Sequence, residues 1–121
     1  MAHILYFAPV DLSGDSGQNI YSSNIVRNLL KNKQHKITVV APEPSTEISF
    51  SISEGNKIHY IKQKRDRSIH WNIAIQPNII QKIYNIHDDS EVDIIITTLR
   101  PSCLSLLVIK TIIGAKYALL I

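Results

Sequence analysis

Apolar residues occur along this chain in two patterns, as short continuous runs and as longer amphipathic stretches. The short runs predict buried strands at 3–8, 36–41, 93–98 and 116–121. Between the first two, apolar residues from Tyr21 to Leu30 recur three and four positions apart, which predicts a helix within 19–33. Two more helices are expected, from Pro77 to about His87 and from Pro101 to Ile113. Gly114 suits the end of the last helix.

The stretch from 45 to 60 has a different pattern, in which apolar residues alternate with polar ones on both sides of a turn signal at Gly55 and Asn56. These apolar residues are Ile48, Phe50, Ile52, Ile58 and Tyr60. The pattern favours a hairpin or a pair of edge strands. Residues 69–76 alternate like a strand but lie next to an expected helix, so their structure stays open at this point.

Strands that alternate with helices predict the fold class α/β. We expect a Rossmann-like, mostly parallel sheet with right-handed crossovers and helices on both faces. Residues 1–121 are short enough for one domain at most. The chain stops at Ile121, inside an expected core strand, so the fold is expected to be incomplete at the C-terminus.

Composition narrows the class of protein further. Apolar residues make up 45% of the chain, enough for a core, and the net charge is only +3, a weak argument for specific nucleic-acid binding. Cys103 is the single cysteine, so the sequence has no internal disulfide and no multi-cysteine zinc site. No secretory signal or membrane-spanning run is visible, and a cytoplasmic protein is expected.

A polar loop with two glycines, residues 11–19, follows the first strand. In an open α/β sheet, ligands bind beyond the carboxyl ends of the strands, where this loop lies. Thr98 and Arg100 follow a predicted central strand and reach the same edge. The candidate substrate-binding residues are therefore Gly14, Ser16, Gly17, Gln18, Thr98 and Arg100. The alternative for the loop is a flexible strand-to-helix turn, and for Arg100 a surface arginine.

Other reactive residues give weaker signals, and no catalytic residue is assigned. Asp11 and Asp15 are interpreted as capping or solvated residues, with a base, an acceptor or a metal ligand as the alternative. The five histidines have no metal-ligand spacing, and no metal site is expected. His35 is expected to cap the first helix, and Cys103 to be a small core residue. A basic patch, Lys62, Lys64, Arg65 and Arg67, is interpreted as a solvated loop or as a peripheral contact with anionic lipid.

Taken in order, these segments resemble the N-terminal Rossmann-like domain of GT-B fold retaining glycosyltransferases that use nucleotide sugars. Three stretches carry the resemblance. They are the strand 4–9 with its glycine loop and helix 21–30, the strand 35–42, and the strand 92–98 with the later strand 114–120. Residues 43–91 match the family poorly.

The chain departs from the family at several positions. Gly17 matches the second glycine of the family's glycine pair, but Ser16 replaces the first, and Gln34 replaces the glycine before His35. Ile96 and Thr98 stand where the family often has histidines, and Lys116 replaces the usual proline.

The resemblance implies an activity and its partners. Residues 1–121 would be part of the acceptor-side domain, and the C-terminal donor-binding domain, with its paired-glutamate motif, would be missing. The reaction would transfer a sugar from a nucleotide-sugar donor to an unknown acceptor without a metal or other cofactor, and the chain alone would be inactive. By resemblance, the loop around Gly17 would help to hold the donor diphosphate.

Two other functions remain open on the sequence. The chain can be a non-catalytic α/β small-ligand-binding module that is complete as it stands. A flavodoxin-like or NAD-type redox domain is disfavoured, because the chain has neither a full Gly-x-Gly-x-x-Gly pattern nor a phosphate loop rich in serine and threonine.

Overall fold

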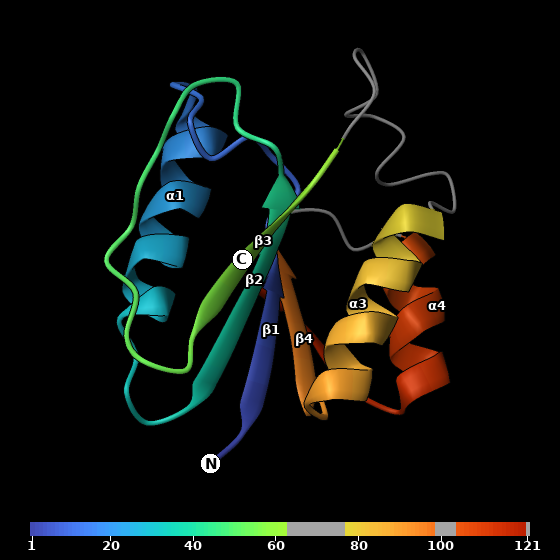
Figure 1. Ribbon diagram of the computed structural model, residues 1–121. Coiled ribbons are helices and arrows are strands. Elements are labelled where there is room, and N and C mark those ends of the chain that lie inside the picture. Colours follow the sequence, from blue (N-terminus) through green and yellow to red (C-terminus); the bar gives the residue numbers. More distant parts are fainter. Residues whose placement is uncertain (63–76, 99–103, 121) are drawn as a thin grey trace.

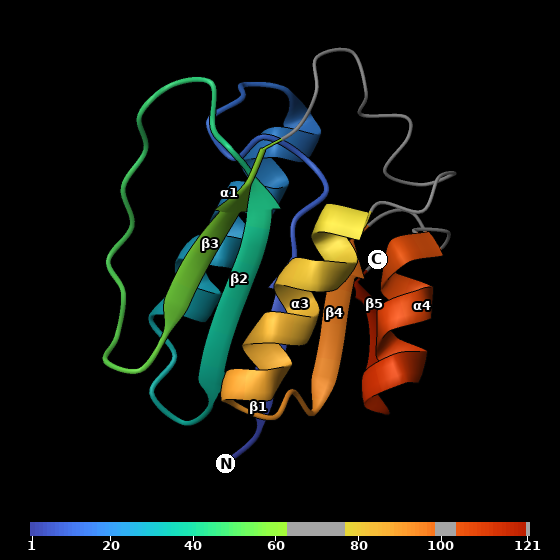
Figure 2. The ribbon, with the colours of Figure 1, turned by 45° about the vertical axis from the view of Figure 1, so that its right-hand side comes forward.

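The computed structural model describes residues 1–62, 77–98 and 104–120 of the chain. Its centre is a five-stranded sheet in the order β3-β2-β1-β4-β5, in which every neighbouring pair is parallel (Figures 1 and 2). The strands are β1 (His3–Phe7), β2 (Lys36–Pro42), β3 (Lys57–Ile61), β4 (Ile94–Thr98) and β5 (Lys116–Leu120). The predicted α/β fold with a parallel sheet is confirmed.

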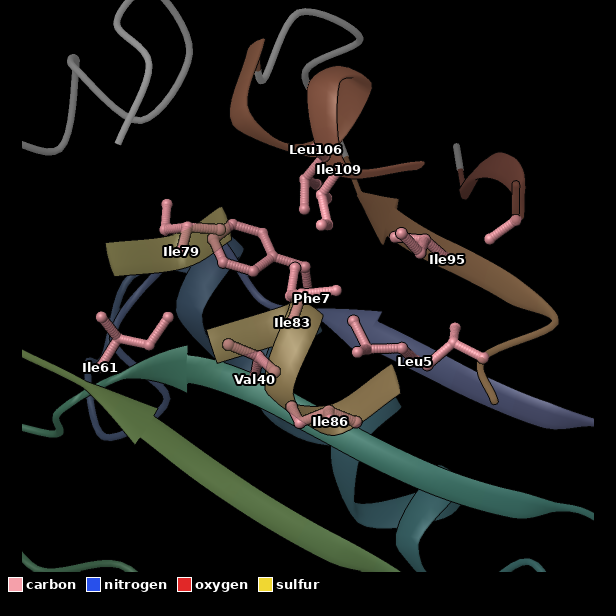
Figure 3. Close-up of a cluster of buried hydrophobic side chains, with 12 residues drawn as sticks. Leu5, Phe7, Val40, Ile61, Ile79, Ile83, Ile86, Ile95, Leu106 and Ile109 are labelled. Atoms are coloured by element: carbon pink, nitrogen blue, oxygen red, sulfur yellow. The ribbon is translucent and has the colours of Figure 1, made fainter. Parts of the chain in front are cut away.

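Helices cover both faces of the sheet. The helix α1 (Gly17–Leu30) lies on one face, and α3 (Pro77–Asp89) and α4 (Leu104–Ile113) lie side by side on the other (Figures 1 and 2). Successive strand residues point to opposite faces, so β1 contributes to two cores. Leu5 and Phe7 pack with the apolar residues of α3 and α4 (Figure 3), while Tyr6 and Ala8 pack on the side of α1.

The ends of the elements agree with the local signals in the sequence. Ser16 is the N-cap of α1, with extended backbone angles. Gly114 follows α4 with a φ of 73°, and the N–H of Ala115 donates to the carbonyl of Lys110 at 3.0 Å. This is the bonding of a Schellman motif, and glycine is the residue that adopts such a φ without strain.

The predicted hairpin over 45–60 is wrong. Its second half is the edge strand β3, which runs parallel to β2, but the residues from Ile48 to Ile52 form no strand. This connection returns from the end of β2 to the start of β3 on the side of α1 (Figure 1). Ile48 and Phe50 of the connection pack against the core. The guanidinium carbon of Arg27 lies 5.1 Å from the centre of the Phe50 ring. The apolar alternation therefore reflects one buried side of an extended loop.

Asn56 fixes the end of this connection and caps α1. Its side-chain amide donates to the carbonyls of Leu30 at 3.0 Å and Asn32 at 2.8 Å, and its oxygen accepts the N–H of Ile37 at 2.9 Å. The helix-capping role expected of His35 therefore falls to Asn56. The Nδ1 of His35 instead accepts the N–H of Ala2 at 3.1 Å.

His3 joins three parts of the fold at the amino edge of the sheet. Its Nδ1 lies 3.0 Å from the carbonyls of both Ser90 and Glu91, so this nitrogen carries the proton. Its Nε2 lies 2.8 Å from the Thr38 hydroxyl, which donates to this nitrogen when the ring is neutral. Burial lowers the pKa of His3, the two carbonyl contacts oppose that shift, and the charge of Lys36 adds to it.

We predict that His3 makes the protein less stable in mild acid. Its folded pKa lies below the ordinary value of 6.5, so the unfolded chain binds more protons between those two values. The stabilisation is complete above pH 6.5 and is lost as the pH falls through the folded pKa. The free energy of unfolding in urea, measured from pH 5 to 8, should fall more steeply below pH 6.5 for the wild type than for His3→Gln. Parallel curves for the two proteins would contradict this role of His3.

Candidate functional site

The loop between β1 and α1 lies at the carboxyl edge of the sheet, beside the point where the strand order changes direction. From β1 the chain proceeds to β2 and β3 on one side, and later to β4 and β5 on the other. Because α1 and α4 cover opposite faces of the sheet (Figure 2), the carboxyl ends of β1 and β4 mark the place where open α/β sheets bind ligands. The predicted site residues stand at or after these two strand ends in the sequence.

Asp11 organises the β1–α1 loop. Its Oδ1 accepts hydrogen bonds from the N–H and the hydroxyl of Ser13, at 2.8 and 2.6 Å, and its Oδ2 accepts the N–H of Ser45 at 3.0 Å. Burial alone would raise the pKa of Asp11, but the hydrogen bonds from Ser13 and Ser45 outweigh it and lower that pKa. Asp11 therefore ties this loop to the segment after β2, and its oxygens are already engaged by the protein.

Gly14 is required by packing within the loop. A Cβ added at Gly14 would lie 2.5 Å from the Cγ and Nδ2 of Asn19. Asn19 cannot easily move, since its amide donates to the Asp11 carbonyl at 2.6 Å and its oxygen accepts the hydroxyl of Ser16. The position of Gly14 against Asn19 accounts for the glycine without a ligand.

Gly17 is in the opposite situation. It is the first residue of α1, it is exposed, and a Cβ added there would meet no atom within 4 Å. Its φ lies outside the left-handed region, so the turn itself does not call for glycine. Asp15 and Gln18 are exposed beside it. Ser16 accepts the N–H of Asn19 at 3.5 Å as the helix cap. The first turn of α1 therefore presents Gly17 and Gln18 to open space.

Thr98 differs from the expected ligand-binding residue. It is fully buried, and its hydroxyl lies 3.3 Å from the hydroxyl of Tyr6, which is also fully buried. Burial raises the pKa of Tyr6, and its contacts with Thr98 and Ser22 partly oppose that shift. Tyr6, Ser22 and Thr98 thus form a buried hydroxyl cluster under α1. Sequence reasoning missed this cluster, although hydroxyl residues within apolar elements were a visible signal for it.

Several predicted features lie outside the described residues. Arg100 and Cys103 are among them, as are Lys64, Arg65 and Arg67 of the basic patch, while Lys62 is described and exposed. Within the described ranges, no group of three or more histidine, cysteine, aspartate or glutamate residues is arranged to hold a metal ion. A search over the same ranges found no helix with the length and apolar content to span a bilayer.

Comparisons with known proteins add no identification: no family model, curated protein or solved structure matches this chain.

We predict that the two loop glycines respond differently to alanine. Gly14→Ala should lower the free energy of unfolding by about 1–3 kcal/mol, because the new methyl group overlaps Asn19. Gly17→Ala should leave stability unchanged or raise it by up to about 1 kcal/mol, because the methyl group has free space and the residue is helical. Urea unfolding of both variants checks this. Equal losses would show that the two positions are equally constrained.

Proposed function

We propose that the chain is part of the acceptor-side domain of a nucleotide-sugar-dependent glycosyltransferase. The single observation that carries the proposal is the open space in front of Gly17, at the start of α1 and at the carboxyl edge where the strand order changes direction. The backbone can be approached there without any steric conflict. The choice of glycosyl transfer among ligand-binding functions rests on the ordered resemblance of the three sequence stretches described above.

The proposed chemistry is electrostatic. When a nucleoside diphosphate leaves the sugar, negative charge grows on its phosphate oxygens. The N–H groups in the first turn of an α-helix, and the helix dipole, favour an anion at that position. Gly17 allows the oxygens to come close, Gln18 can donate a side-chain hydrogen bond, and Arg100 would add a positive charge. Such preorganised donors stabilise the developing charge without a metal ion.

The other predicted residues take supporting roles in this proposal. Gly14 and Asp11 hold the loop in its shape, and Thr98 keeps Tyr6 in place beneath α1. A second domain would have to supply the donor-binding half of the cleft. We therefore expect residues 1–121 to release no nucleoside diphosphate from a nucleotide sugar when tested alone.

We predict that Gly17→Val in the complete gene product lowers kcat/KM for sugar transfer at least about tenfold, or about 1.4 kcal/mol of transition-state stabilisation. The isopropyl group would fill the space that the anion needs. Transfer would be measured as acceptor-dependent release of nucleoside diphosphate from a panel of UDP-, GDP- and dTDP-sugars, with Lys33→Ala as the surface control.

The outcomes separate the candidate functions. If the wild type transfers sugar and Gly17→Val has the same kcat/KM, Gly17 is not part of the site. Saturable binding of a nucleotide sugar or free sugar without turnover would favour the non-catalytic ligand-binding module. Folding of each variant would be verified by its urea unfolding curve, and the free space around Gly17 leads us to expect that this position tolerates a side chain.

A further inference from the structure

A cavity lies at the amino edge of the sheet, at the opposite end of the strands from the β1–α1 loop and on the face that carries α3. Its volume is about 180 Å³, enough for several water molecules, each of which takes about 30 Å³ in the liquid. We call it the amino-edge pocket. It is lined by His3, Lys36, Thr38, Lys57, His59, Lys82, Asn85, Ile86, Asp89 and Ser90.

The sequence of β2 and β3 explains why the pocket exists. On the face toward α3, the carboxyl half of these strands carries Val40 and Ile61, which belong to the buried core. The amino half carries polar residues at the equivalent positions, Lys36 and Thr38 on β2 and Lys57 and His59 on β3. Polar side chains cannot extend the apolar packing under α3, and a polar-lined cavity remains.

The charge of the pocket is strongly positive. Lys36, Lys57 and Lys82 come from three different elements, and Asp89 is the only carboxylate among the described residues of the lining. In the described part of the chain, none of the three ammonium groups forms an ion pair. Burial lowers the pKa of His59, and the charges of Lys82 and Lys57 lower it further, so both ammonium groups act on the interior of the pocket. Burial likewise lowers the pKa of His3, which favours its neutral form.

The donors in the pocket define the ligand chemistry. Lysine ammonium groups bind phosphate as point charges, and the Asn85 amide and the neutral His59 ring can each donate one more hydrogen bond. Among the described residues of the lining, Ile86 is the only aliphatic one, and no phenylalanine, tyrosine or tryptophan is present to stack on a nucleobase. The volume suits an anion of a few heavy atoms.

We propose that the amino-edge pocket binds a small phosphate-bearing anion through Lys36, Lys57 and Lys82. This site is separate from the carboxyl-edge loop of the proposed transferase function and does not depend on it. The phosphate can be free in solution or belong to a lipid headgroup. We favour the free anion, because the pocket is recessed between α3 and the sheet.

Inorganic pyrophosphate is the test ligand. Titration into the ¹⁵N-labelled 121-residue chain at constant ionic strength, followed by NMR, should give saturable shifts at Lys57, His59 and Lys82. The bound anion should also raise the pKa of His59, since it offsets the two neighbouring ammonium charges. Lys57→Gln and Lys82→Gln should each weaken binding about fivefold or more, whereas the charge-matched Lys110→Gln on α4 should not.

Asp89→Asn is expected to change the affinity for pyrophosphate in the opposite direction from the lysine variants. It removes the one carboxylate in the described part of the lining and should strengthen pyrophosphate binding severalfold, a gain that damage to the fold would not produce. Equal weakening by Lys110→Gln and Lys57→Gln, or shifts that do not saturate, would mean general counter-ion attraction and overturn the proposal. Binding to phosphatidylglycerol vesicles without binding of pyrophosphate would overturn the free-anion site and assign the lysines to a lipid surface.

Discussion

The burial of β1 on both faces is the constraint on which the rest of the structure depends. Leu5, Tyr6 and Phe7 are all fully buried, and β1 is hydrogen-bonded to β2 on one side and to β4 on the other. A strand in this position needs apolar side chains along most of its length, and helices have to cover both of its faces. His3, at the amino end of β1, is the polar exception and is held by hydrogen bonds. The position of β1 in turn places the β1–α1 loop at the carboxyl edge where the strand order changes direction, so the place of the candidate site follows from the core.

The same demand explains how much of the fold was predictable from the sequence. β1, β2 and β4 are short apolar runs because two-sided burial leaves little room for polar side chains, and α3 has a clear apolar stripe because only one side of it meets the sheet. The segment before β3 misled the prediction. Phe50 contacts a core on one side only, and this produces the same alternation in an extended loop as in a strand.

The position of the β1–α1 loop at the carboxyl edge was predictable from the sequence, but the contacts within the loop were not. Gly14 and Gly17 look equivalent in the sequence, and only the position of Asn19 shows that the first serves packing while the second faces open space. Asp11 looked like a residue free to cap or be solvated, but its two oxygens meet Ser13 and the distant Ser45. Contacts between residues more than thirty positions apart leave no periodic signal in a single sequence. The amino-edge pocket was missed for the same reason, because its lysines lie on three separate elements.

The two ends of the sheet use polar side chains in different ways. At the carboxyl edge, hydrogen bonds within the protein engage the side chains of Asp11, Ser16 and Asn19. The backbone of Gly17 stays exposed beside them. At the amino edge, His3 and Thr38 satisfy one another, and the side chains of the three lysines remain. A parallel α/β sheet is compatible with many functions, so its strand order does not select among them. The chemistry of each edge is instead set by the polar groups that the fold leaves without a protein partner. At the carboxyl edge these are backbone N–H groups, and at the amino edge they are lysine ammonium groups.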